Sequence, residues 1–174
     1  MTLTENHKLI IMRHAKSDWS TDASTDFDRP LSSRGDRDAP RMAGWLADQG
    51  LVPGLILCSP ALRTKQTVLA VVEKLRIPEQ EIVWEQKIYE ASLSQLLDVL
   101  DRYSAAANSV LLVGHNPGLD SLLEYLSDTP PVYRRGKLMT TAAIAVLGFG
   151  DQGISTREHS ARLEMLVRPK DLEE

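Results

Sequence analysis

With 174 residues, 43% of them hydrophobic and 25% charged, the chain has the composition of one globular domain with enough apolar material for a core. Its 20 lysines and arginines against 24 aspartates and glutamates give a net charge of −4, which argues against a surface for nucleic acid or anionic membrane. The single cysteine, Cys58, excludes an intrachain disulfide framework, and no N-terminal apolar segment is long enough for a signal peptide or membrane span. We therefore expect a single domain over residues 1–174, located in the cytoplasm.

The first predicted element is a buried strand over residues 8–13, because Leu9 to Met12 is an unbroken apolar run. This strand ends abruptly in Arg13 and His14. A polar stretch from Ala15 to Ser33 follows, and loops of this length are often functional. With its Trp19, Phe27 and four aspartates (Asp18, Asp22, Asp26, Asp28), it is either a packed surface loop or a surface that grips a protein.

The next segment predicts a helix whose Met42, Trp45 and Leu46 share one face and which stops at Gly50. Pro40 lacks the N–H that a helix interior needs, so we expect a short first turn from Ser33 and a main helix that begins near Asp38.

Residues 55–58 predict a second buried strand, followed by a helix over residues 61–75 that carries Arg63 in its first turn. The pattern then indicates a short strand near residues 82–86, a helix from Ser92 and a buried strand over 109–115 that ends in His115. A further helix over 116–126 precedes two strands at 142–149 and 161–167. Alternation of apolar and charged residues places the last strand at a sheet edge.

This order predicts an α/β domain of three layers, with a mostly parallel central sheet flanked by helices on both faces. Loops at the carboxyl ends of parallel strands line the ligand crevice of such sheets. Arg13, His14, Arg63 and His115 all follow strand ends, so we expect them to lie together. Because a cluster of like charges repels itself in an empty core, the cluster indicates an anion site, with a phosphoryl group as the leading candidate.

Five segments also resemble the histidine phosphatase superfamily in order and spacing: RHAKS (13–17), DRPLSSRG (28–35), SPALRTKQT (59–67), IYEAS (88–92) and VGHNPG (113–118). The resemblance implies a phosphoglycerate-mutase-like fold. It is greatest to the short SixA-type phosphohistidine phosphatases, which lack the large inserted caps of other members. One departure is Ala15, where the family usually has glycine; the extra methyl group tightens the pocket without removing a catalytic group.

These residues support a two-step phosphoryl transfer. Neutral His14 has a ring nitrogen that can attack phosphorus, which gives a phosphohistidine intermediate for water to hydrolyse. Arg13 and Arg63 offer planar donor forks to the equatorial oxygens, His115 offers a further hydrogen bond, and the arginine charges lower the pKa of His14. No metal or other cofactor is expected, since no Cys/His or carboxylate cluster suggests a metal site.

Three further residues are weaker candidates. Glu90 lies in the loop where the family often places a proton-donating acid, although a solvated loop glutamate fits the sequence nearly as well. Lys16 and Ser17 follow the proposed nucleophile and are either substrate-binding groups or ordinary loop residues.

The sequence therefore predicts a metal-independent phosphatase. The resemblance to the SixA type implies phosphohistidine on a protein as the favoured substrate, because a short chain without caps leaves an open site that admits a protein side chain. The alternatives are a phosphatase for a small phosphorylated metabolite and a non-catalytic module that binds phosphorylated partners. A mutase is disfavoured because it must keep water from its intermediate.

Overall fold

The structure is a computed structural model that describes residues 6–132 and 137–173. These residues contain six strands: β1 (His7–Arg13), β2 (Leu55–Cys58), β3 (Ile82–Trp84), β4 (Ser109–Gly114), β5 (Ile144–Gly150) and β6 (Arg162–Val167). They form one sheet in the order β3-β2-β4-β1-β5-β6. Strands β1 to β4 pair in parallel, whereas β5 runs antiparallel to both β1 and β6. The predicted mostly parallel sheet is confirmed, with β6 at one edge.

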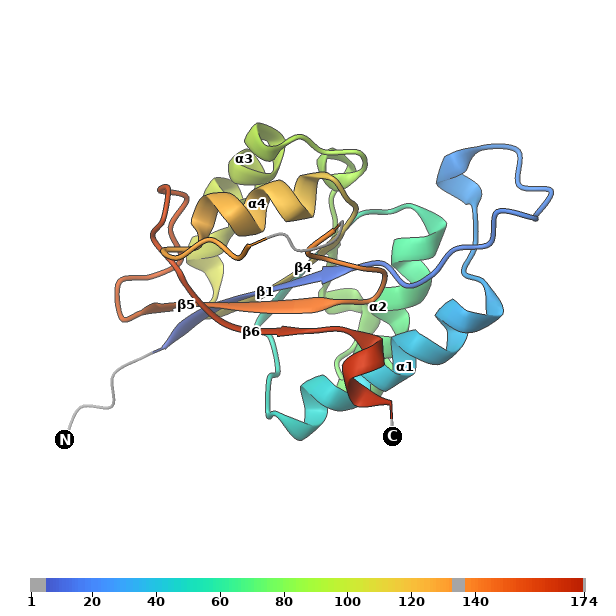
Figure 1. The fold of residues 1–174 in the computed structure, drawn as a ribbon, viewed down its shortest axis with the longest axis horizontal. Helices are drawn as coiled ribbons and strands as arrows, with labels where there is room; N and C mark the ends of the chain where they lie inside the picture. The colour runs from blue at the N-terminus through green and yellow to red at the C-terminus, as the bar shows by residue number, and fades with distance from the viewer. Residues whose placement is uncertain (1–5, 133–136, 174) are drawn as a thin grey trace.

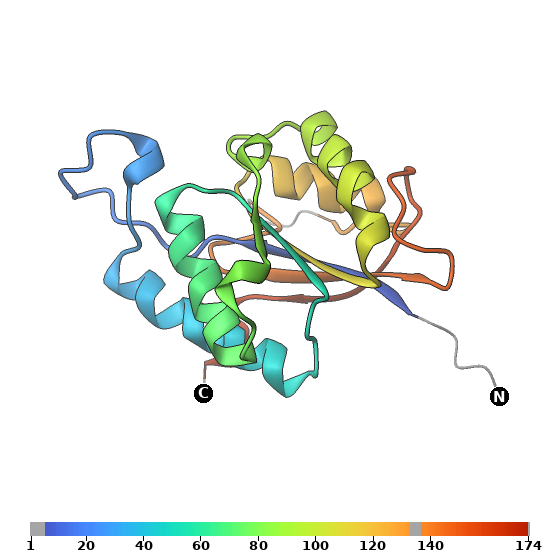
Figure 2. The ribbon, with the colours of Figure 1, turned by 180° about the vertical axis from the view of Figure 1, so that it is seen from behind.

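Four α-helices in the described residues cover the two faces of this sheet: α1 (Ser33–Asp48), α2 (Leu62–Leu75), α3 (Leu93–Tyr103) and α4 (Gly118–Leu126). Helices α3 and α4 lie on one face, and α1 and α2 lie on the other (Figures 1 and 2). The three-layer α/β prediction is therefore also confirmed. None of the described helices has both the length and the apolar character that a membrane crossing requires.

The central strand β1 explains why its sequence is continuously apolar. Leu9 and Ile11 belong to the core cluster that includes residues of α3 and α4, while Ile10 and Met12 belong to the cluster that includes residues of α1 and α2. All four side chains are fully buried. Since successive side chains of a strand point to opposite faces, a strand covered on both faces must be apolar at every position.

Helix α1 differs from the prediction, because it runs without a break from Ser33 to Asp48 through Pro40. The carbonyl that lacks its proline N–H partner is that of Asp36, an exposed residue whose carbonyl can turn to water. Burial of Ala39 and Met42 on the opposite face holds the helix together around the proline. The expected helix start near Asp38 was wrong; Ser32 caps the helix by accepting the N–H of Gly35.

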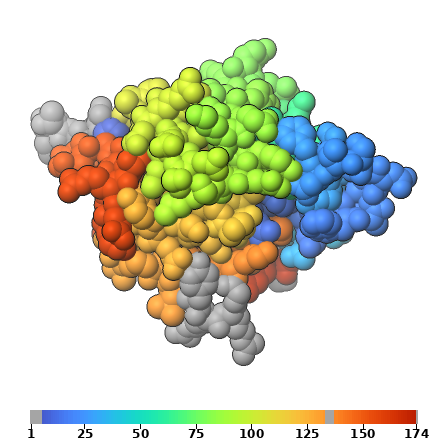
Figure 3. Space-filling model, turned by 90° about the horizontal axis from the view of Figure 1, so that it is seen from above, coloured from blue at the N-terminus to red at the C-terminus, as the bar shows by residue number. Residues whose placement is uncertain are grey.

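The segment between β1 and α1 is a loop whose base is pinned closed. Ser17 and Leu31 form an isolated antiparallel bridge, and the N–H of Ser32 donates to the carbonyl of Lys16 at 2.8 Å. Between these contacts the chain protrudes from the body of the molecule (Figures 1 and 3). Its single turn of 3₁₀ helix, Asp26–Asp28, lies against helix α2. The loop is therefore an anchored structure beside the carboxyl ends of β1 and β4.

A glycine makes this anchorage possible, and its replacement tests the fold. A Cβ atom at Gly35 would lie 2.1 Å from the carbonyl oxygen of Lys16. We expect Gly35→Ala to displace the loop base and lower the free energy of unfolding by roughly 1–3 kcal/mol, measured by urea denaturation. Gly44→Ala in the same helix is the control, since its Cβ meets only the end of the Lys74 side chain at 3.9 Å. Equal stability changes in the two variants would contradict the proposed close approach.

Candidate active site

The carboxyl edge of the sheet brings together the four residues that the sequence singled out. Arg13 ends β1 opposite Gly114 of the neighbouring strand, so His14 and His115 leave adjacent strands side by side, with ring centroids 5.3 Å apart. Arg63 reaches the same place from the first turn of α2. His14, Arg63 and His115 are 6%, 4% and 6% exposed, so these polar groups are almost fully withdrawn from water.

The hydrogen bond of His14 fixes which ring nitrogen is free. Its Nδ1 lies 2.7 Å from the carbonyl oxygen of Ala15, and because a carbonyl only accepts, Nδ1 carries the proton. Nε2 of the neutral ring therefore keeps its lone pair. Burial lowers the pKa of His14 to about 3, and the charges of Arg13 and Arg63 add to this shift. The predicted electrostatic cause is present, but burial is the larger one.

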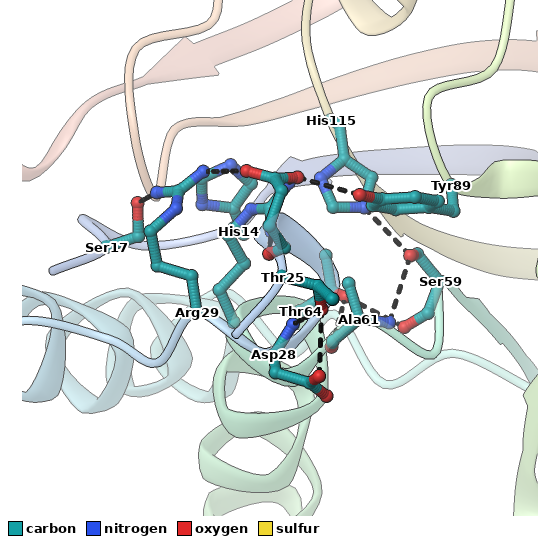
Figure 4. Close-up of polar contacts among 12 residues, drawn as sticks. His14, Ser17, Thr25, Asp28, Arg29, Ser59, Ala61, Thr64, Tyr89 and His115 are labelled. Carbon is teal, nitrogen blue, oxygen red and sulfur yellow. Dashed lines mark hydrogen bonds and ion pairs between the residues drawn. The ribbon is translucent and has the colours of Figure 1, made fainter. Parts of the chain in front are cut away.

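Arg63 is bound by the carboxylate of Asp26, which the sequence had placed only in the polar loop after the first strand. Its Nη1 donates to the backbone carbonyl of Asp26 at 2.7 Å, and its Nη2 donates to the Asp26 carboxylate at 3.0 Å. The same carboxylate accepts from the Tyr89 hydroxyl at 2.7 Å and from Nη2 of Arg29 at 2.6 Å. Figure 4 shows the Arg29 and Tyr89 side chains on either side of the His14 and His115 rings. The expectation that only a ligand anion balances the cluster was therefore wrong in part.

The pKa of Asp26 shows how strongly this carboxylate is held as an anion. Burial opposes its ionisation, but hydrogen bonds from Arg29 and Tyr89 and the charge of Arg63 outweigh that effect. Its pKa consequently lies well below the usual range for aspartate. Burial, together with the hydrogen bond to Asp26, raises the pKa of Tyr89 to about 12, so the hydroxyl remains a donor.

Arg13 is oriented by a separate arrangement on the other side of the site. Its Nη1 donates to the carbonyl of Met139 at 3.1 Å, which also accepts from the Asn116 amide at 2.8 Å. The carboxylate of Asp120 in α4 holds this segment by accepting the N–H groups of Leu138 and Met139 at 3.0 and 2.8 Å. Burial lowers the pKa of Arg13, and the charge of Asp120 partly offsets this effect.

His115 is neutral and has a nitrogen without a partner. Its Nε2 lies 2.8 Å from the hydroxyl oxygen of Ser59, and that oxygen accepts the N–H of Ala61 at 3.3 Å (Figure 4). Burial lowers the pKa of His115 to about 3, with further contributions from His14 and Arg63. Among the described residues, its buried Nδ1 has no hydrogen-bond partner.

Three guanidinium groups of the site also have a buried nitrogen atom without a hydrogen-bond partner. In the described part of the chain, the Nε atoms of Arg13, Arg29 and Arg63 are buried and lack an acceptor. Buried donors are nearly always satisfied in folded proteins, so unpaired donors in one cluster indicate a place for an anionic ligand. A phosphoryl group, with several negatively charged oxygens, matches this set of donors.

The weaker candidates, Lys16, Ser17 and Glu90, differ in how they contact this cluster. The buried hydroxyl of Ser17 accepts a hydrogen bond from Arg29, and the backbone carbonyl of Lys16 holds Ser32. Glu90 is exposed, has a φ of 53° and lines a cavity of about 440 Å³ that also borders His115. Ser17 is thus tied to the cluster, while Glu90 stands at its rim.

The sequence analysis did not assign Arg29, Asp26, Tyr89 or Ser59 to the site. Three of them lie in segments that resemble the family, Arg29 in residues 28–35, Ser59 in residues 59–67 and Tyr89 in residues 88–92, whereas Asp26 was one of several aspartates in the polar loop. No group of three or more His, Cys, Asp or Glu side chains suited to a metal ion occurs within residues 6–132 and 137–173. Independence from metals stays a prediction.

Comparisons with known proteins agree with this geometry. Residues 9–98 match the family model for the histidine phosphatase superfamily, branch 1. The phosphohistidine phosphatase SixA of Escherichia coli K12 is 32% identical over 154 residues, which span 86% of this chain and 89% of that protein. A functionally uncharacterised protein of Mycobacterium tuberculosis is 31% identical over 141 residues, covering 78% of this chain and 85% of the relative.

Solved structures extend the likeness to the fold. The protein histidine phosphatase SixA in complex with tungstate has a TM-score of 0.78 at 26% identity, covering 95% of this chain and 99% of that one. A putative SixA from Agrobacterium tumefaciens gives a TM-score of 0.75 at 29% identity, with 94% and 99% coverage. A phosphoglycerate mutase from Bacillus anthracis shares the fold, with a TM-score of 0.69 at 13% identity over 92% of each chain.

The chain belongs to the histidine phosphatase superfamily and is a phosphatase. Within that superfamily it is of the SixA type.

The lowered histidine pKa values predict how stability depends on pH. Unfolded histidine has a pKa near 6.5, whereas His14 and His115 have values of about 3 in the folded chain. The unfolded state therefore takes up protons first, so the contribution of each histidine is complete above pH 6.5 and is lost as the pH falls toward 3. Between pH 7 and 5 we expect a loss of roughly 2 kcal/mol per histidine in the free energy of unfolding. His14→Gln should remove about half of the combined loss of the two histidines, measured by urea denaturation at several pH values. If the variant and the wild type showed the same dependence of the free energy of unfolding on pH, burial of neutral His14 would be contradicted.

Proposed function

We propose that this phosphatase hydrolyses phosphohistidine on proteins, through a phosphohistidine intermediate on its own His14 and without a metal ion. The observation that carries the proposal is the fixed tautomer of His14, which leaves Nε2 unprotonated on a ring that the charges of Arg13, Arg63 and Arg29 influence. The name of the Escherichia coli relative, phosphohistidine phosphatase SixA, supports the substrate class.

In the first step, the Nε2 lone pair of His14 attacks phosphorus and forms a P–N bond. The bond to the leaving group breaks at the same time, and the leaving group takes the bonding electrons. Arg13 and Arg63 stabilise the negative charge on the equatorial oxygens, and His115 in its Nδ1-protonated tautomer supplies a further donor. An imidazole leaving group is already protonated on its phosphorylated ring and needs no acid from the protein.

In the second step, a water molecule attacks phosphorus from the side opposite the P–Nε2 bond, where the leaving group was bound. The P–Nε2 bond breaks, its electrons return to His14, and the proton of the attacking water passes to the phosphate product or to solvent. Because burial keeps the pKa of His14 low, the ring is released neutral and ready for the next cycle.

The short connections between the strands support a protein substrate. In the described residues, each connection between successive strands contains at most one α-helix, so no extra helical subdomain is inserted there. An uncapped site at the carboxyl edge suits a phosphorylated side chain presented by another protein. The cytoplasmic location remains a prediction.

A substrate panel tests this function. We expect kcat/KM to be highest for a phosphohistidine protein, lower for phosphoserine and phosphotyrosine peptides, and lowest for sugar phosphates. Treatment with a metal chelator should leave these values unchanged. A preference for a sugar phosphate would instead identify a metabolite phosphatase, whereas tight binding of the phosphoprotein without turnover would identify a binding module.

The role of Glu90 is tested by the chemistry of the leaving group. An alkoxide needs a proton as the P–O bond breaks, whereas nitrophenolate and protonated imidazole leave without one. If Glu90 is the proton donor, Glu90→Gln should lower kcat/KM for alkyl phosphates by about 100-fold and change the other two substrates little. Equal losses for all three would indicate a positioning role, and no loss would make Glu90 an ordinary rim residue.

A further inference from the structure

The most connected side chain beside the site is a carboxylate that the proposed mechanism does not use. The carboxylate of Asp26 binds Arg63 of α2, Arg29 of its own loop and Tyr89 of the segment before α3. In addition, the backbone carbonyl of Asp26 accepts from Arg63. One residue thus ties together three segments that are distant in sequence.

The two arginines need such a partner because they are buried. The side chains of Arg63 and Arg29 are 5% and 10% exposed, and a buried charge without a counter-charge is strongly unfavourable. An arginine side chain also has many rotamers, so a bond at two donor atoms restricts its guanidinium to one orientation. Asp26 supplies both the charge and the restriction from a side chain that is 39% exposed.

We propose that Asp26 is a positioning residue, which orients Arg63 and Arg29 for the phosphoryl group and acts on the reaction only through them. The proposal rests on the proposed function, because it assumes that Arg63 binds the transferred group. It requires the arginines to keep donors for a ligand while Asp26 is bound. Asp26 takes the Nη atoms of Arg63 and one Nη atom of Arg29, whereas the buried Nε atom of each has no partner among the described residues.

The opposite reading is that Asp26 competes with the phosphoryl group for Arg63. The two roles predict opposite changes in the affinity for an anion when Asp26 loses its charge. Loss of a positioning carboxylate weakens anion binding, whereas loss of a competing anion strengthens it. Calorimetric titration with tungstate, used as a phosphate analogue, separates them.

The first experiment compares two substitutions in one loop. Asp26→Asn should lower kcat/KM for a phosphohistidine peptide and for phosphoramidate by roughly 10- to 100-fold, and should weaken tungstate binding, because misplaced donors lose transition-state contacts. Asp26→Glu, which keeps the charge, should recover part of the loss. Asp22→Asn removes the same charge from another position of this loop, where the side chain makes no hydrogen bond or ion pair with another described residue, and it should stay within about twofold of wild type.

A double-mutant cycle then tests whether Asp26 acts through Arg63. In the Arg63→Ala background, Asp26→Asn should weaken tungstate binding clearly less than it does in the wild-type background, because Arg29 is then the only arginine left for Asp26 to position. Tyr89→Phe removes one hydrogen bond to Asp26 but keeps the ring, so it should reproduce a smaller part of the same loss even if Asp26→Asn folds poorly.

Each outcome has a separate meaning. Tighter tungstate binding by Asp26→Asn, or an equal loss in both backgrounds, would overturn the positioning role. If Arg63→Ala alone had wild-type kinetics, the proposed phosphoryl site would fail. Loss on Arg63→Ala together with wild-type behaviour of Asp26→Asn and Tyr89→Phe would remove only the inference about Asp26.

Discussion

Burial of two histidines, His14 and His115, and two arginines, Arg29 and Arg63, at one edge of the sheet determines the chemistry of this protein. Burial is the largest cause of the lowered pKa values of both His14 and His115. A neutral imidazole with one proton fixed on Nδ1 is a nucleophile without need of a separate base. The parallel pairing of β1 with β4 makes this possible, because Arg13 pairs with Gly114 and the two histidines follow directly after these neighbouring strand ends.

Burial of cationic groups has a cost, and the fold offsets it with two carboxylates, the partly exposed Asp26 and the buried Asp120. Asp26 binds Arg63 and Arg29 directly from the loop after β1. Asp120 acts on Arg13 by its charge and by holding the segment whose Met139 carbonyl accepts the Arg13 hydrogen bond. These carboxylates leave donor atoms of the arginines unpaired, which suits a site that must attract a phosphoryl group and then release phosphate.

Sequence reasoning found the features that local patterns encode. The apolar runs of β1 and β4 predicted buried strands, and the position of Arg13, His14 and His115 at strand ends predicted their convergence. The helix through Pro40 was missed because packing of its buried face, which depends on the rest of the fold, outweighs the local preference of proline. Asp26 was missed because its bonds to Arg63 and Tyr89 join residues 37 and 63 positions apart, and no periodicity records such contacts.

The central claim is that neutral His14 attacks phosphorus through Nε2. The most direct measurement is nitrogen-15 NMR of histidine-labelled protein near neutral pH, before and after reaction with phosphoramidate and an alkaline quench. The structure predicts a neutral His14 protonated on Nδ1 in the free protein, and phosphorus coupled to Nε2 of His14 in the trapped adduct. A protonated imidazolium in the free protein, or phosphorus on Nδ1 or on another residue, would contradict the account.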